Sequence, residues 1–187
     1  GLEPLAKIIM AQNCTNPENA ASRFISDKVA DEKDALAGAC DIIAEWVNEN
    51  ENARSRVRDQ FTRYAVITSK VIKDKEEDAI KYSTYFDYFA PLNRVSSHNY
   101  LAMRRGETEG MLRVSIGVDD ERTLGRLYPL FVKRNAQPES AELVKKAVED
   151  AYKRLTRPAI ENEIAAQAKY KADTTAIDTF ASNLRQL

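Results

Sequence analysis

The stretch DEKDALAGACDIIAEWVNE, residues 31–49, decides the class of fold, because it is the clearest helix in the sequence. Apolar side chains recur in it every three or four residues, which places them on one face of an α-helix of about four turns. Asp31 can cap its first turn. Gly38 costs about 1 kcal/mol relative to alanine in the middle of a helix, and a close contact with another helix explains it better than flexibility does.

The same period predicts helices on both sides of this one. They are expected over residues 4–12, 16–25, 51–64, 96–106 and 139–157. Ser96 or Ser97 can cap the helix that Gly106 ends. Pro158 ends the helix over 139–157 or begins the next one, and Asp173 can cap the final helix.

Two short segments depart from the helical period. Residues 65–72 are rich in β-branched side chains, and in residues 112–118 apolar and polar side chains alternate. Both patterns are typical of strands. The predicted fold is therefore mainly α, a multi-helical region with a small two-stranded β element. It divides into a helical part (1–64), a small α/β insert (65–118) and a second helical part (119–187).

The segment KYSTYFDYFAPL, residues 81–92, holds five aromatic rings. On a helix ending near Pro91, the rings of residues 82, 85, 86 and 89 share one face. Base-stacking surfaces interleave rings with cations, whereas the only cation here is Lys81, at the edge of the run. The rings are interpreted as core, and only Tyr88, which lies off that face, keeps a claim to a surface role.

Composition limits the classes of partner. The net charge is −1, so no global positive field attracts phosphate polymers or anionic lipid, and any nucleic-acid contact needs a local patch. Cys14 and Cys40 lack metal-binding spacing and predict reduced thiols in a cytoplasmic protein, with a disulfide as the alternative. No apolar run is long enough to span a bilayer, so no membrane partner is expected. The start at Gly1 indicates a fragment of a longer protein.

The sequence offers little for catalysis. Its single histidine, His98, has no second imidazole or thiolate nearby in the sequence to form a metal site, and is interpreted as a capping or packing residue. The six glycines permit no phosphate-binding loop. The acidic run Glu76, Glu77 and Asp78 is interpreted as a solvated turn. We therefore expect no catalytic residue, no metal and no cofactor, and a protein that is not an enzyme.

Basic residues form three candidate clusters for phosphate contact. The first lies on the helix over 51–64, the second at the end of the helix over 96–106 and on the strand after it, and the third near residue 145. The members are Arg54, Arg58 and Arg63; Arg104, Arg105 and Arg113; and Lys145 and Lys146. Two alternatives stay open for them, contact with a nucleic-acid backbone and stabilisation of the folded chain.

The strings KYSTYFDYFAPL and SSHNYLAMRRGETEGMLRVSI resemble a motif of the bacterial Tex family of transcription accessory proteins. In that family a KYxDYFxxxEPL-like stretch precedes PSHRxLAxxRGxxEGxL. The resemblance extends to LAGACDIIAEWV upstream and to EDAYKRLTRPAIENEI and AIDTFASNLRQL downstream. This sequence departs from the motif at three places: Asp78-Ala79 replaces a frequent glycine, Phe89 a usually polar residue, and Ser96 a common proline.

The resemblance implies the central helical region of a longer, modular protein, just before an RNase H-like domain. Family members also carry a helix-turn-helix element, whose boundaries are left open here, and a C-terminal RNA-binding domain that lies outside this sequence. Two functions fit. One is a non-enzymatic scaffold and nucleic-acid-binding region, for RNA or DNA, in transcription regulation. The other is a spacer and protein-interaction region that docks on RNA polymerase or transcription factors, with RNA bound by other domains.

Overall fold

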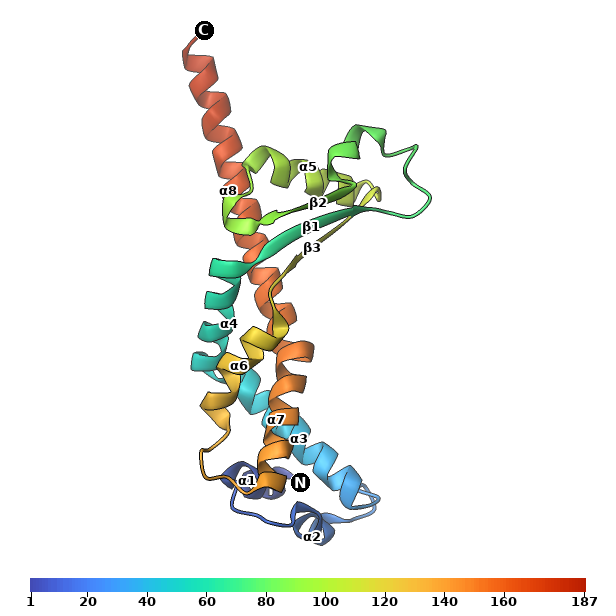
Figure 1. Ribbon diagram of the computed structural model, residues 1–187, viewed down its shortest axis with the longest axis vertical. Helices are drawn as coiled ribbons and strands as arrows, with labels where there is room; N and C mark the ends of the chain where they lie inside the picture. The colour runs from blue at the N-terminus through green and yellow to red at the C-terminus, as the bar shows by residue number, and fades with distance from the viewer. The chain divides into compact units, whose positions relative to one another are not determined.

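The computed structural model describes residues 1–187 and divides into two compact units. Unit 1 comprises Gly1–Val57 and Asp119–Ala159, and unit 2 comprises Arg58–Val118 and Ile160–Leu187. The chain passes between them within α4 (Glu51–Tyr64), after β3 (Leu112–Gly117) and within α8 (Arg157–Arg185). Helices dominate both units (Figure 1), which confirms the mainly α class. None of the helices combines the length and apolar character that crossing a bilayer requires.

Unit 1 is built from helices only. They are α1 (Glu3–Ala11), α2 (Pro17–Ala21), α3 (Glu32–Glu49), the first part of α4, α6 (Asp120–Phe131) and α7 (Pro138–Asp150). A short 3-10 helix follows α2 (Ser22–Phe24), and a π-helical turn follows α7 (Ala151–Thr156). The predicted cap of α3 is confirmed, since Asp31 accepts a hydrogen bond from the backbone N–H of Asp34 at 2.8 Å. α6 was not predicted from the sequence.

The core of unit 1 forms where α3 meets α1 and α7. One face of α3 is buried, including Ala39 and Ile43, and so are Ile9 of α1 and Val144 of α7. The predicted role of Gly38 is confirmed, because a Cβ built there would lie 2.4 Å from Cδ1 of Leu2, the residue before α1. A glycine at this point lets the start of α1 pack closely on α3.

Unit 2 contains a three-stranded antiparallel sheet in the order β2-β1-β3. The strands are β1 (Val66–Val71), β2 (Asp87–Pro91) and β3. The two predicted strands are β1 and β3, and they pair with Ile67 opposite Ile116. α5 (Ser97–Thr108) packs on one side of the sheet (Figure 1), and 3-10 helices lie at Ile80–Tyr85 and Leu92–Arg94. The alternation of the strands thus gives the sheet one covered side.

The aromatic segment does not form the predicted helix. Tyr82 and Tyr85 are buried in a 3-10 helix, but the chain then extends into β2, where Phe89 is 75% exposed. Side chains alternate between the two sides of a strand, so pairing of β2 with β1 separates Phe89 from the other rings. The prediction that Phe89 belongs to the core is wrong.

Tyr88 is the aromatic residue of β2 that faces the covered side. Its hydroxyl lies 3.4 Å from Nδ2 of Asn99 in α5, which donates to it, and its ring meets Tyr85 edge-on at 5.5 Å between centroids. Tyr88 was predicted to be the ring with a claim to the surface, but in the structure the exposed ring is that of Phe89.

Two predicted helix ends also differ from the structure. Gly106 lies inside α5, which continues to Thr108, and the turn after it is made by Gly110 with a φ of 75°. In the last third, Pro158 is the second residue of α8, in agreement with the alternative that it begins a helix, and α8 then runs through Asp173 without a break. The π-helical turn widens the helix just before Pro158, which makes room for a ring that clashes with a regular α-helical turn. Asp173 pairs with Lys169 at 2.8 Å and caps nothing.

Candidate nucleic-acid interface

Four of the eight predicted basic residues are held by partners within the chain. Arg58 pairs with Glu163 at 2.6 Å, Arg63 with Asp59 at 2.9 Å and Arg104 with Glu107 at 2.8 Å. Arg54 donates to the backbone carbonyl and side chain of Asn48 at 3.3 and 3.2 Å. Each of these four side chains therefore has at least one acceptor within the chain.

The other four lie on three different elements, α7, α5 and β3. Lys145 and Lys146 are exposed on α7 in unit 1, and Lys146 borders a groove rich in carboxylates. Arg105 lines a small cavity of about 390 Å³ in unit 2, together with His98 of α5. Arg113 is exposed on β3. Of the predicted residues, only Arg113 lies on the sheet of unit 2.

The uncovered side of the sheet, which we name the open sheet face, consists of three rows across β2, β1 and β3. The register places Pro91, Val66 and Gly117 in the first row, Phe89, Thr68 and Ser115 in the second, and Asp87, Lys70 and Arg113 in the third. An exposed ring therefore lies one row from two cations. Phe89 was not predicted as a surface residue because residues 82–89 were placed on a helix. Lys70 lies in a segment correctly predicted as a strand, but it was not among the basic residues proposed for phosphate contact.

Polar contacts order the open sheet face. The hydroxyls of Thr68 and Ser115 lie 2.9 Å apart, and Lys70 forms an ion pair with Asp87. Arg113 stands directly opposite Lys70 and has no carboxylate partner. Like charges opposite each other on a sheet are unfavourable, and an anion placed between them relieves that repulsion. The third row therefore holds two cations and one carboxylate, and Asp87 partly neutralises Lys70.

On the covered side, residues 81–85 are bonded both to β1 and to Glu109 at the end of α5. The hydroxyl of Tyr82 donates to Glu109 at 2.6 Å, and Lys81 pairs with the same carboxylate at 3.0 Å. The hydrogen bonds from Tyr82 and Lys81 lower the pKa of Glu109. Ser69 of β1 donates to the carbonyl of Tyr85 at 2.8 Å. These bonds tie the central strand and the end of α5 to one segment, so the exposed ring stands on a supported surface.

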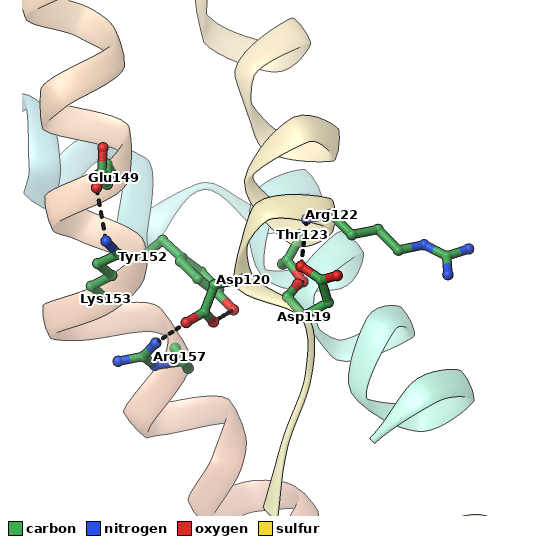
Figure 2. Close-up of polar contacts among 8 residues, drawn as sticks. All are labelled: Asp119, Asp120, Arg122, Thr123, Glu149, Tyr152, Lys153 and Arg157. Carbon is green, nitrogen blue, oxygen red and sulfur yellow. Dashed lines mark hydrogen bonds and ion pairs between the residues drawn. The ribbon is translucent and has the colours of Figure 1, made fainter. Parts of the chain in front are cut away.

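A polar cluster of unit 1 lies at the start of α6 (Figure 2). Asp120 accepts hydrogen bonds from the hydroxyl of Tyr152 and from Arg157, both at 2.6 Å. Asp119 caps α6 by accepting from the N–H of Arg122 at 3.1 Å, and Thr123 donates to the carbonyl of Asp119. The cluster joins α6 to the π-helical turn and the start of α8.

Tyr152 behaves in this cluster as a structural donor. Its ring is fully buried, and burial, followed by the hydrogen bond to Asp120, raises the pKa of its hydroxyl far above the usual value. The hydroxyl therefore stays protonated near neutral pH, where it cannot act as a base. The guanidinium of Arg157 lies over the same ring at 5.6 Å. This cluster was not foreseen from the sequence, because its members come from two separate segments.

Comparisons with known proteins show which family the sequence matches. The family described as "Tex central region-like" matches residues 12–180. "Transcriptional accessory protein Tex" of Neisseria gonorrhoeae is 29% identical over 191 residues, covering the whole chain and 25% of the relative. "Protein YhgF" of Escherichia coli is 34% identical over 199 residues, covering the whole chain and 26% of that relative. "S1 RNA-binding domain-containing protein 1" of Pongo abelii is 26% identical over 175 residues, or 91% of this chain and 16% of the relative. The chain thus spans about a quarter of the length of the bacterial relatives.

Proposed function

The chain belongs to the Tex family of transcription accessory proteins, as the central region of its members, and on this premise we propose that it is a non-enzymatic scaffold region that binds single-stranded nucleic acid on the open sheet face. The observation that carries the proposal is the 75% exposed ring of Phe89 on a supported sheet, one row from Lys70 and Arg113. A neutral face with a lone ring would not favour a polyanion.

The two rows suit the two parts of a nucleotide. An unpaired base stacks on an exposed aromatic ring for about 1–3 kcal/mol, and Arg113 offers a planar donor to a phosphate. Rows on one side of a strand lie about 7 Å apart, and the three strands span about 10 Å. The face is therefore large enough for a short piece of strand. Bases in a duplex are already stacked, so the ligand must be single-stranded.

The proposal is tested by titrating the 187-residue chain into a labelled single-stranded oligonucleotide of about 12 nucleotides, as RNA and as DNA, at about 50 and 200 mM salt. We expect salt-sensitive binding, and a loss of about 5- to 150-fold for Phe89→Ala, from the energy of one stacked base. Phe180→Ala, which removes a 66% exposed ring from α8 of the same unit, is the matched control and should bind normally.

Removal of charge gives a second readout. Arg113→Gln should flatten the dependence of log affinity on log salt by about 0.7 for a single strand. Asp87→Asn should strengthen binding, because Lys70 loses the carboxylate that now neutralises it. Equal binding by Phe89→Ala and Phe180→Ala, or binding that ignores salt, would refute the proposal. A preference between the RNA and DNA arms would identify the sugar that is recognised.

A further inference from the structure

Unit 1 contains an open groove of about 1060 Å³ that the nucleic-acid proposal leaves unexplained. It is bordered by α2, α3 and α7, and we name it the α3–α7 groove. Its floor is apolar and consists of Leu36, Ala37 and Cys40 of α3 and Leu143 and Ala147 of α7. Leu36 and Cys40 are one helical turn apart, and so are Leu143 and Ala147. Two such ridges with a channel between them form the kind of groove that takes a third helix.

Cys40 belongs to this floor as an apolar group. Burial, and then the charge of Asp41, raises the pKa of its thiol, so the thiol stays neutral. Its sulfur lies 4.0 Å from the carbonyl of Leu143, which closes the floor between the two helices. The structure shows both cysteines free, and no disulfide closes this groove.

The rim of the groove is acidic. Five carboxylates line it, against the two lysines Lys33 and Lys146. Asp150 pairs with Arg154 at 2.8 Å, and Asp31 caps α3. The carboxylates that remain without a hydrogen bond or an ion pair are Glu18, Glu32 and Asp41. They come from α2 and from both the first turn and the middle of α3, so the negative charge extends along the groove.

We propose that the α3–α7 groove binds an amphipathic, basic helix of a protein partner. The apolar side of that helix lies on the floor, and its lysine and arginine side chains reach the carboxylates of the rim. Charge complementarity selects this occupant, because the same carboxylates repel the phosphates of a nucleic acid. A helix with side chains is about 10 Å wide with a pitch of 5.4 Å, so the groove volume holds roughly two and a half turns.

This site lies in unit 1 and does not depend on the open sheet face of unit 2. Its probe is a synthetic peptide of about 14 residues, with leucine at the a and d positions of a heptad and lysine elsewhere. A second peptide has glutamate in place of every lysine. Binding to the 187-residue chain is measured by fluorescence anisotropy at low and high salt.

Two groove variants and one matched control separate specific docking from general charge attraction. Ala37→Trp fills the floor from an exposed position of α3 and should weaken binding of the lysine peptide at least tenfold at either salt concentration. Asp41→Lys should weaken it about three- to tenfold at low salt and less at high salt. Glu45→Lys, an equal charge change one turn further along α3 and outside the groove, should change it less than twofold.

Three results would overturn the proposal. The first is unchanged peptide binding in Ala37→Trp, and the second is an equal loss in Asp41→Lys and Glu45→Lys. The third is oligonucleotide binding that falls in Ala37→Trp while peptide binding does not, since the groove would then take nucleic acid. Helical circular dichroism of each variant, compared with that of the unchanged chain, verifies that the substitutions preserve the fold.

Discussion

Replacement of Gly106 by alanine tests why the family motif has a glycine in the last turn of α5. A Cβ at this position would lie 2.4 Å from Cδ1 and 2.8 Å from Cγ of Leu112, and 3.3 Å from Cδ1 of Tyr82. Favourable carbon contacts lie at about 3.5–4.0 Å, so Leu112 would have to move by about 1 Å. Leu112 is 1% exposed and Tyr82 is 4% exposed, and neither side chain has space to retreat into.

Two opposing effects set the magnitude. Overpacking of a core costs about 1–3 kcal/mol, whereas alanine gains about 1 kcal/mol over glycine within a helix. Because two contacts fall below 3.0 Å, we expect the upper part of the cost and a net loss of about 1–2 kcal/mol. That loss lowers Tm by about 2–8 °C for a chain of this size.

The assay is thermal unfolding followed by circular dichroism, with Gly125→Ala as the control. Gly125 lies in α6, is exposed, and would bring no heavy atom within 4 Å of a new Cβ. The Gly125→Ala variant therefore gains helix propensity without a new steric contact, and it should be more stable than the unchanged chain by up to about 1 kcal/mol. A Gly106→Ala protein as stable as the unchanged chain, or a Gly125→Ala protein that is equally destabilised, would refute the packing argument.

Two further predictions concern polar contacts. Tyr152→Phe removes the 2.6 Å hydrogen bond to Asp120. Hydrogen bonds to charged groups contribute about 1.5–3 kcal/mol, but the Asp120 side chain is 37% exposed and recovers part of this from water. Urea titration should therefore show a free energy of unfolding that is lower by about 1–2 kcal/mol. The lowered pKa of Glu109 means that its stabilising contribution is present above the ordinary carboxyl pKa and disappears as pH falls through the folded-state value. Glu109→Gln should therefore lose less stability than the unchanged chain on acidification below about pH 5; an equal loss in both would contradict this.

Local periodicity was sufficient for most helices and for two strands. The α3 stripe and its Asp31 cap are properties of neighbouring residues, and so is the alternation in β3. The aromatic segment was different, because its rings fit a helical period and the segment 86–90 also fits a strand. Pairing with β1 decided the outcome, and β1 lies about twenty residues earlier. A single-sequence pattern contains no information on that pairing.

The same limit applies to the basic residues. An acid four residues before Arg63 is visible in the sequence, and Asp59 does pair with it. The partner of Arg58 is Glu163, 105 residues away, and nothing local separates Arg58 from the exposed Arg113. Spacing along a chain finds contacts within one helix, but it cannot tell which cations the fold has already neutralised.

Phe89 and the residues that identify the family lie on opposite sides of the sheet. Lys81, Tyr82 and Glu109 belong to the shared motif, and all three hold α5 against the covered side. Gly106 serves the same contact. Phe89 is a position at which this sequence departs from the motif, and its side chain points to solvent. The family resemblance therefore accounts for the scaffold, while base stacking on Phe89 would be a property of this chain that the family motif does not supply.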